Sequence, residues 1–329
     1  MYARAQGAVY QPKLLINPQT TMNNYTRMLL VAACLFAGDG LLLAQTPTDA
    51  VMMKPREACL AVMYDHGKFD EYWEGSKLRT NATIATVHRR TIMPMIAIGI
   101  IDNLNVIIST PYVRTKSDEP NGGKLEGAKG FQDFGLVVKY RFLNRETETG
   151  KVAFVGALGF STPMTNYLSD YLPYSLGFGA PEVSGRAIVQ YEWNSGFYAR
   201  ASGAYLWRGE TEAERDYYYA NGSYYTAWMD VPNAVNFQLV AGKWFFGHSF
   251  HVEALYNSTT CLSGDDIRAY NAAQPTNRVE VGQVGLNAQY FFPNIKGFGV
   301  LAYYSQIISG RNMGKFTNLG AGLTYQFKF

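Results

Sequence analysis

The residues of this chain that could take part in chemistry are its 29 basic and 26 acidic side chains, four histidines and three cysteines. Many charged residues alternate with apolar ones, as in the stretch GFQDFGLVVKYRFL at 130–143. A period of two places alternate side chains on opposite faces of a β-strand. Asp133, Lys139 and Arg141 therefore share one face, opposite Phe134 and Tyr140.

The same alternation recurs in EVSGRAIVQYEW and FYARASGAYLWR, which a short turn at 194–196 separates. If this turn sets the register of a hairpin, three pairs face each other: Glu182 with Arg208, Gln190 with Arg200, and Glu192 with Tyr198. Opposite charges in such positions would pair. The predicted charged face comprises Asp133, Lys139, Arg141, Glu182, Arg186, Glu192, Arg200, Arg208 and Glu253.

The histidines give no catalytic signature. His248 adjoins Ser249, but a base and a nucleophile must converge in space with a third group that orients the base. His251 lies two residues before Glu253 and reads as a satisfied interior histidine. No Cys/His cluster has metal-ligand spacing, and no glycine-rich phosphate loop follows a strand. We therefore expect no enzymatic activity, no metal and no cofactor, with a hydrolase kept as the less favoured alternative.

Composition indicates that β-strands position these side chains. Aromatic residues make up 15% of the chain, with 24 Tyr and 32 Gly, and Tyr and Gly at this level favour strands and turns. A mean hydropathy of −0.13 is too polar for a bundle of transmembrane helices. The apolar run IMPMIAIGII at 92–101 has the length of a membrane-spanning strand, roughly 9–11 residues. A net charge of +3 with both signs interspersed excludes a nucleic-acid partner.

From position 57 onward, alternating runs separated by Asn, Gly, Asp or Pro predict about twelve strands, an even number typical of bacterial outer-membrane barrels. The expected strands are 57–66, 82–100, 104–115, 131–143, 151–163, 181–193, 197–209, 233–245, 249–258, 278–292, 298–309 and 316–329. Their connections alternate between short and long, with long ones near 67–81, 116–130, 164–180, 210–232, 259–277 and 310–315. Short periplasmic turns and long external loops characterise such barrels. We therefore predict an all-β fold, a transmembrane antiparallel up-and-down β-barrel.

The apolar strand faces carry aromatic residues at both ends, Tyr191 and Trp193 near a short turn and Tyr205 and Trp207 near a long connection. Aromatic girdles of this kind mark the two edges of a bilayer. The apolar face would meet outer-membrane lipid, and the charged face would line a lumen. A barrel of this size should leave a narrow passage or one closed by loops.

We expect three parts along the chain. Residues 1–44 read as a misplaced start followed by an export signal, with translation from Met22 and cleavage before Gln45. An alternative makes Cys34 the lipidated residue of a lipoprotein. Residues 45–56 would form a short periplasmic segment able to sit in the barrel mouth, and 57–329 the barrel. Cys59 and Cys261 would lie near opposite ends, too far apart for a disulfide.

Three stretches, FQDFGLVVKYRFL, FVGALGFSTPMTN and ISGRNMGKFTNLGAGLTYQF, together resemble the outer-membrane family named for the meta pathway of phenol degradation. The sequence departs from that family where Met164 follows Pro163 in place of Thr-Gly. The resemblance implies a transporter-like barrel in the outer membrane of a Gram-negative cell, for small hydrophobic or aromatic compounds. The terminal Phe329 also resembles the signal by which barrel assembly machinery recognises its clients.

These observations favour a channel or transporter for small molecules with a narrow charged lumen. The charged residues would orient a polar group of a passing solute, or would only brace the interior as ion pairs. The loop residues Tyr171, Tyr174, Tyr218 and Tyr224 would capture an apolar ligand, or would only extend the girdle and pack the loops. A structural or adhesion barrel without flux is the alternative function.

Overall fold

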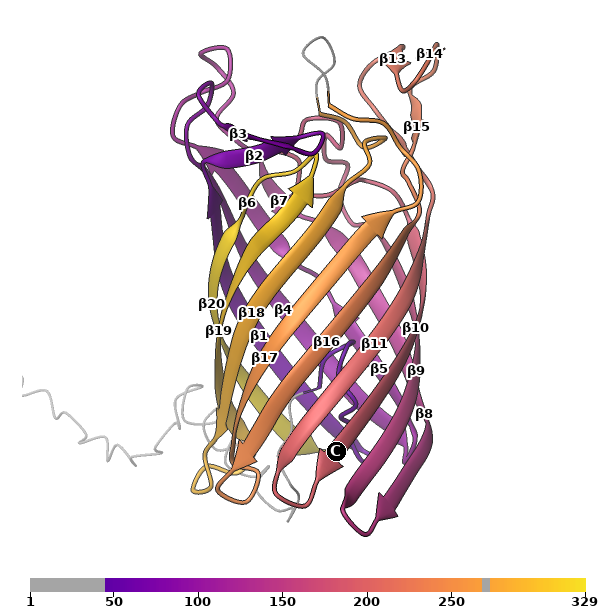
Figure 1. Cartoon of the computed structure of the whole chain (residues 1–329), viewed down its shortest axis with the longest axis vertical. Coiled ribbons are helices and arrows are strands. Elements are labelled where there is room, and N and C mark those ends of the chain that lie inside the picture. Colours follow the sequence, from indigo (N-terminus) through magenta and orange to yellow (C-terminus); the bar gives the residue numbers. More distant parts are fainter. Residues whose placement is uncertain (1–44, 268–272) are drawn as a thin grey trace, which may run out of the picture. The chain divides into compact units, whose positions relative to one another are not determined.

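The computed structural model describes residues 45–267 and 273–329. Within these residues the chain is all-β and closes a barrel of twelve antiparallel strands, as predicted (Figure 1). Among the same residues, no helix has the length and apolarity needed to cross a membrane. The predicted start at Met22, the export signal up to Ala44 and the alternative lipidation site Cys34 lie outside the described residues.

The barrel strands follow one another around the wall, and β1 closes it by pairing with both β4 and β20. Their bounds are β1 Glu57–Phe69, β4 Val87–Ile101, β5 Leu104–Ser109, β6 Tyr112–Ser117, β7 Lys129–Phe131, β8 Asp133–Thr147, β9 Gly150–Pro163, β10 Glu182–Trp193, β11 Phe197–Arg208, β16 Ala234–Phe245, β17 Phe250–Cys261, β18 Glu280–Phe291, β19 Phe298–Arg311 and β20 Thr317–Lys328. Closure leaves no unpaired edge in the wall, which a membrane-spanning sheet requires.

Two of the twelve barrel strands are interrupted, so each carries two labels: β5 with β6, and β7 with β8. The expected strand 104–115 is divided into β5, which pairs with β8, and β6, which pairs with β7. The break falls at Pro111, whose nitrogen cannot donate a hydrogen bond to a neighbouring strand. Gln132 separates β7 from β8 in the adjacent barrel strand. The expected boundary at 82 was also wrong, because β4 begins at Val87.

The connections separate by length, as expected. Short turns at 102–103, 148–149, 194–196, 246–249 and 292–297 lie at one end, and the long connections lie at the other (Figure 1). The long connections contain short strand pairs that the alternation did not reveal: β2 Glu71–Glu74 with β3 Lys77–Thr80, β12 Glu210–Glu212 with β15 Trp228–Asp230, and β13 Tyr218–Tyr219 with β14 Ser223–Tyr224. We call the two ends the turn end and the loop end.

The outward face of the wall is apolar. Leu158 is 69% exposed and Leu323 55%, whereas their inward neighbours Ala157 and Thr324 are buried. The aromatic residues lie where the parity predicted: Trp193 is 41% exposed near the turn end and Trp207 50% exposed near the loop end. Each packs against the tyrosine two residues before it, Tyr191 and Tyr205, respectively. The predicted division into an apolar outer face and a more polar inner face is therefore confirmed for these strands.

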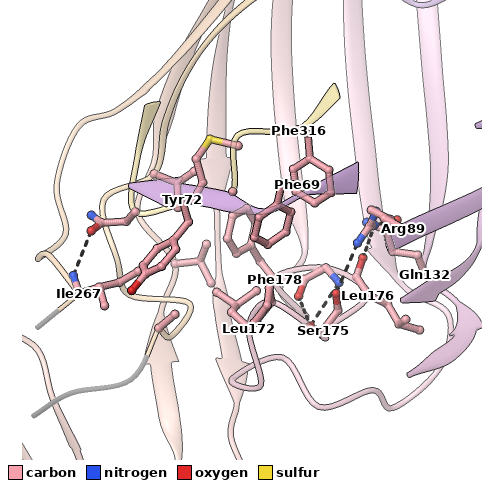
Figure 2. A pocket seen from close by; sticks show the side chains of 18 of the residues that line it. Phe69, Tyr72, Arg89, Gln132, Leu172, Ser175, Leu176, Phe178, Ile267 and Phe316 are labelled. Atoms are coloured by element: carbon pink, nitrogen blue, oxygen red, sulfur yellow. Dashed lines mark hydrogen bonds between the residues drawn. The ribbon is translucent and has the colours of Figure 1, made fainter. Parts of the chain in front are cut away.

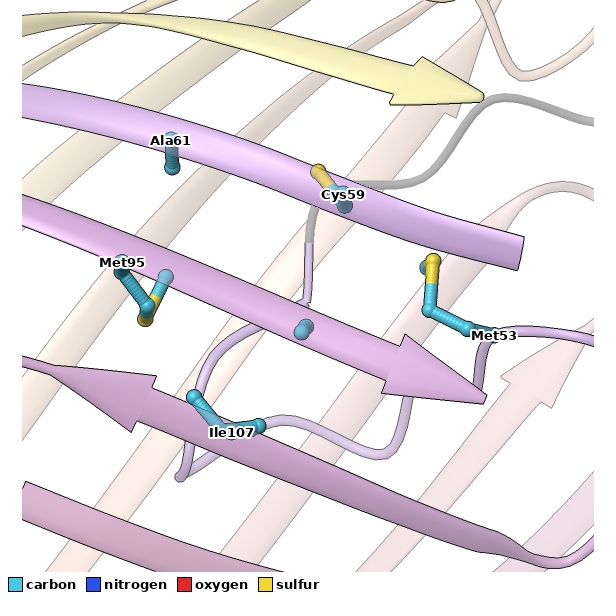
Figure 3. Close-up of a cluster of buried hydrophobic side chains, with 6 residues drawn as sticks. Met53, Cys59, Ala61, Met95 and Ile107 are labelled. Carbon is cyan, nitrogen blue, oxygen red and sulfur yellow. The ribbon is translucent and has the colours of Figure 1, made fainter. Parts of the chain in front are cut away.

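Residues 45–56, which we call the inner segment, lie inside the barrel toward the turn end (Figure 1). Figure 3 shows Met53 of this segment beside Cys59 of β1, with Met95 and Ile107 on the inner faces of neighbouring strands. Ile107 is 1% exposed because it packs against this inner segment. The contact explains why strand β5 carries an apolar residue on its inward face.

Candidate functional site

The inner segment is fixed to the wall by Lys139 of β8. The Lys139 Nζ donates hydrogen bonds to the Thr46 carbonyl at 2.9 Å, Asp49 Oδ1 at 2.9 Å and the Val51 carbonyl at 3.2 Å. The Lys139 side chain is 0% exposed. An ammonium group has three donors, and all three are used here. A buried charge requires such complete pairing, so Lys139 and the inner segment form one structural unit.

A small cavity of about 200 Å³ lies next to the inner segment, and we call it the turn-end cavity. Its polar wall is a connected network: Arg200 contacts Glu253 at 3.2 Å, and the Tyr198 hydroxyl donates to Glu253 at 2.7 Å. The same hydroxyl lies 3.1 Å from Nδ1 of His251, whose Nε2 lies 3.0 Å from Gln289 Oε1. Both ring nitrogens of His251 therefore have partners, and the prediction of a satisfied interior histidine is confirmed.

Three buried polar atoms at this cavity have no hydrogen-bond partner within the described part of the chain: Arg200 Nε, Gln238 Oε1 and Gln289 Nε2. Two are donors and one is an acceptor. The cavity therefore offers two donors and one acceptor, which could bind water or a small polar solute.

A larger cavity of about 670 Å³ occupies the loop end of the lumen, and we call it the loop-end cavity (Figure 2). Its apolar lining includes Phe69, Leu172, Phe178 and Phe316, as Figure 2 shows. Its charged lining comprises Arg89, Asp133, Glu182 and Arg208. Two cations and two anions balance one another, so the cavity combines aromatic surface with polar groups at no net charge.

The mouth of the loop-end cavity is narrowed by residues 164–181, which we call the mouth loop. Arg89 of β4 holds this loop by donating to the Leu176 carbonyl at 2.6 Å and the Ser175 carbonyl at 3.4 Å (Figure 2). Tyr174 is 1% exposed, and its hydroxyl lies 2.7 Å from Ser117 Oγ. The loop is therefore folded onto the inner wall rather than extended into solvent.

Tyr167 of the mouth loop makes a second link to the wall by donating from its hydroxyl to Asp133 Oδ1 at 2.7 Å. Burial, and then the neighbouring Asp133 carboxylate, raise the pKa of Tyr167 well above its usual range. The phenol therefore stays protonated at neutral pH and acts as a donor to Asp133.

The predicted register of the β10–β11 hairpin is confirmed: Glu182 faces Arg208, Gln190 faces Arg200, and Glu192 faces Tyr198. Arg208 and Glu182 form the expected ion pair at 2.9 Å, and the Arg208 guanidinium also lies over the Phe178 ring at 5.2 Å. Arg200 instead forms an ion pair with the carboxylate of Glu253, which lies two strands away on β17. Hairpin register alone could not reveal that partner, because the barrel curvature brings the two side chains together.

The predicted charged residues do not form a single site. Asp133, Glu182 and Arg208 line the loop-end cavity, and Arg200 and Glu253 line the turn-end cavity. The others have separate partners: Lys139 with Asp49, Arg186 with Ser202 and Asn236, Arg141 with Asn103, and Glu192 with His248. The sequence interpretation did not identify Arg89, although it links the loop-end cavity to the mouth loop. Its inward position in VHRRTIMP could have indicated it.

None of the four predicted capture tyrosines lines the loop-end cavity. Tyr171 and Tyr174 border a separate hollow of about 360 Å³ between residues 125–130 and 165–176. Tyr218 and Tyr224 stack on each other with ring centroids 5.1 Å apart. These contacts fit the alternative in which the tyrosines pack the loops. The aromatic residues that do line the loop-end cavity occur one at a time at strand ends and in loops. No repeated sequence pattern therefore predicted their position.

The remaining chemistry-bearing residues are dispersed. His248 contacts Glu192 at 3.0 Å at the turn end. Cys59 and Cys261 are free thiols and form no disulfide with each other, as predicted, and both are buried. Among the residues that the structure describes, no group of three or more His, Cys, Asp or Glu side chains could hold a metal ion.

No family model matches the sequence, and no curated protein matches it, so the family resemblance noted above stays a prediction. Among solved structures, an outer membrane channel from Pseudomonas putida F1 is similar with a TM-score of 0.69 at 13% identity, covering 86% of this chain and 100% of that one. The monoaromatic hydrocarbon channel CymD matches with a TM-score of 0.40 at 10% identity, over 84% of this chain and 89% of that one. The first likeness shows the fold alone, and we base no argument on the second.

Proposed function

We propose that this protein is an integral outer-membrane channel that takes small, partly apolar solutes through its lumen. The observation that carries the proposal is the loop-end cavity, about 670 Å³ within a closed barrel and lined by both aromatic and charged side chains. Cavities of several hundred Å³ with mostly apolar walls and a few placed polar groups are typical of small-molecule sites. The similar fold of an outer membrane channel supports this reading.

The outer surface supports a location in the membrane. Strands of 12 to 15 residues, such as β10 and β4, exceed the roughly 9–11 residues that a tilted spanning strand needs. Between their ends these strands carry exposed apolar side chains on the outward face, such as Val189 of β10 and Ile92 of β4, and Trp193 of β10 and Trp207 of β11 lie toward opposite ends. Exposed Phe329, which follows β20, would serve as the assembly signal recognised by barrel assembly machinery.

The lining of the loop-end cavity suggests the solute class. Phe69, Phe178 and Phe316 offer aromatic surface, and the balanced pairs of charges offer hydrogen bonds without a net field. A neutral aromatic or aliphatic compound with one or two polar groups fits such walls better than a strongly charged ion. The basic residues of the predicted charged face add no net positive charge, because Lys139 and Arg200 each have a carboxylate partner.

The inner segment would set the narrowest part of the path. It occupies the lumen toward the turn end, which we assign to the periplasmic side, and it borders the turn-end cavity through Thr46, Asp49 and Val51. A solute leaving the loop-end cavity would have to pass this segment or displace it. We therefore expect slow, selective flux rather than the conductance of an open pore.

The proposal is tested by reconstituting the folded barrel in planar bilayers and in liposomes. We expect small, reproducible conductance steps, and faster uptake of aromatic alcohols than of sugars of similar mass. Correctly folded protein that shows neither conductance nor uptake would contradict the channel and favour the structural or adhesion barrel. Hydrolysis of lipid or peptide that disappears in Ser249→Ala or His251→Ala would instead support an enzyme.

A further inference from the structure

The outer surface at the loop end carries a row of basic side chains that the solute path does not use. Cross-strand pairing places His66 of β1 opposite Arg90 of β4, Arg90 opposite Arg114 of β6, and Arg114 opposite Lys129 of β7. Residues directly opposite one another point to the same face of a sheet. Arg90, Arg114 and Lys129 are exposed, and each lies on the outward face of its strand.

A second basic row lies one step farther toward the loops. Lys68 faces His88, and His88 faces Lys116, again across β1, β4 and β6. His66 Nε2 lies 3.2 Å from His88 Nδ1, so the two rows are in contact. We call these two rows together the basic grid. It extends over adjacent strands at one level of the barrel.

The residues one step toward the turn end of the first row are apolar. Tyr64 faces Ile92, Ile92 faces Tyr112, and Tyr112 faces Phe131. Tyr64 and Ile92 are each 47% exposed, and Phe131 is 43% exposed. The basic grid therefore begins where the apolar outer band ends. In a membrane, this boundary is the level of the lipid headgroups.

Acidic residues neutralise only the margin of the grid. Lys116 contacts Glu126 at 3.5 Å, and His88 contacts Asp118 at 3.3 Å. Arg90, Arg114 and Lys129 form no ion pair with any residue in 45–267 or 273–329. Like charges directly opposite one another destabilise a sheet, so this arrangement favours an external anion that bridges the strands.

The grid is confined to one side of the wall. Near the loop end of β10, β11 and β16, the outward positions are Val183, Trp207 and Val235, which are 49%, 50% and 39% exposed. A general need for solubility would not concentrate cations on β1, β4, β6 and β7 while β10, β11 and β16, elsewhere in the same wall, stay apolar at their loop ends. The local contrast points to a specific anionic partner in the membrane.

We propose that the basic grid binds the phosphate groups of a phosphorylated lipid in the outer leaflet, with its acyl chains along the row from Tyr64 to Phe131. The inference rests on the proposed membrane location, but not on flux through the lumen. Arg90 and Arg114 can each bind a phosphate with two parallel hydrogen bonds, and Lys129 adds a point charge. A lipid with two phosphates matches a row that spans several strands better than a lipid with one.

The test measures binding of bisphosphorylated lipid A to the folded protein in phosphatidylcholine nanodiscs by native mass spectrometry. The variant Arg90→Gln, Arg114→Gln, Lys129→Gln removes the first row's permanent charges. We expect its affinity to fall roughly a hundredfold, because each basic residue near an anionic lipid surface contributes about a factor of five. The matched control Lys77→Gln, Arg145→Gln, Lys151→Gln removes equal charge from exposed positions elsewhere and should bind as the unmodified protein does.

Equal affinity of the first-row variant and the unmodified protein would overturn the proposal, as would undiminished binding of lipid A stripped of its phosphates. Heat-dependent gel migration checks that each variant is folded. If the triple variant does not fold, Arg114→Gln alone should weaken binding about fivefold. Conductance in phosphatidylcholine bilayers is measured in parallel. Conductance without phosphate-dependent binding would refute lipid binding by the basic grid and support the channel. Phosphate-dependent binding without conductance would support the grid and contradict the channel.

Discussion

Lys139 of β8 and Asp49 of the inner segment form a buried ion pair, with 2.9 Å between Nζ and Oδ1, across 90 residues of sequence. The pair joins the barrel wall to a segment that precedes the first strand. Because its partners lie on two different parts of the fold, the position of the inner segment in the lumen depends on both charges. A substitution of either residue should therefore change how much of the lumen the inner segment occupies.

The substitution Lys139→Met should release the inner segment from the wall. It leaves Asp49 buried without its cation and the Thr46 and Val51 carbonyls without their donor. Removing one partner of a buried pair typically costs about 3–5 kcal/mol, so the segment should leave the lumen rather than retain the orphaned charge. We expect larger conductance steps in planar bilayers and faster cleavage of residues 45–56 by added protease.

The double variant Lys139→Met, Asp49→Leu is the control for this effect. It removes both charges and leaves apolar groups of similar size, which buried pairs often tolerate with little loss of stability. Conductance and protease resistance should return toward those of the unmodified protein. If Lys139→Met itself leaves both measurements unchanged, the ion pair does not hold the segment.

The substitution Arg89→Gln should loosen the mouth loop. The shorter amide cannot reach the Ser175 and Leu176 carbonyls that the guanidinium binds together. The barrel wall should remain folded, because the substitution removes no strand pairing and β4 stays bonded to β1 and β6. We expect faster proteolysis within 164–181 and weaker discrimination between solutes, measured by uptake into liposomes. Arg145→Gln, at an exposed position of β8, should leave both properties as they are.

The substitution Phe178→Ala should reduce the uptake of aromatic solutes more than that of sugars. It removes an apolar wall of the loop-end cavity and the ring beneath the Arg208 guanidinium. Loss of one well-buried aromatic contact is worth roughly 1.5 kcal/mol, or about a tenfold lower affinity. Phe237→Ala provides the comparison, since Phe237 is 46% exposed on the outer face. An equal loss in the two variants would show that the cavity does not select solutes.

The fold could be predicted from sequence because its determinants are local. Alternation in stretches such as EVSGRAIVQYEW defines both faces of a strand, and one short turn fixes the register from Glu182 opposite Arg208 to Glu192 opposite Tyr198. The exterior of a barrel also repeats the same apolar requirement on every strand. Many independent segments therefore gave consistent information about architecture.

The candidate site was less predictable because its contacts are not local. Lys139 was placed correctly on the charged face, but its partner Asp49 lies in a segment without any strand pattern. Arg89 meets the mouth loop 87 residues away at Leu176. Alternation gives the direction of a side chain, but not the loop or segment that fills the lumen opposite it. The basic grid was missed for a related reason, because charges on an outward face contradict the expected apolar pattern.

The substitution Gly99→Ala should displace the inner segment without changing any charge. A Cβ at Gly99 would collide with the backbone carbonyl of Lys54, which flexible side chains cannot relieve. The Arg56 N–H also donates to the Gly99 carbonyl at 3.1 Å, so this contact is where the segment joins β1. Gly203→Ala is the matched control, because a Cβ there meets no atom within 4 Å. We expect Gly99→Ala to increase conductance and protease access to 45–56, and Gly203→Ala to change neither. Equal behaviour of the two variants would mean that the inner segment does not limit flux, even if Lys139→Met alters the stability of the barrel.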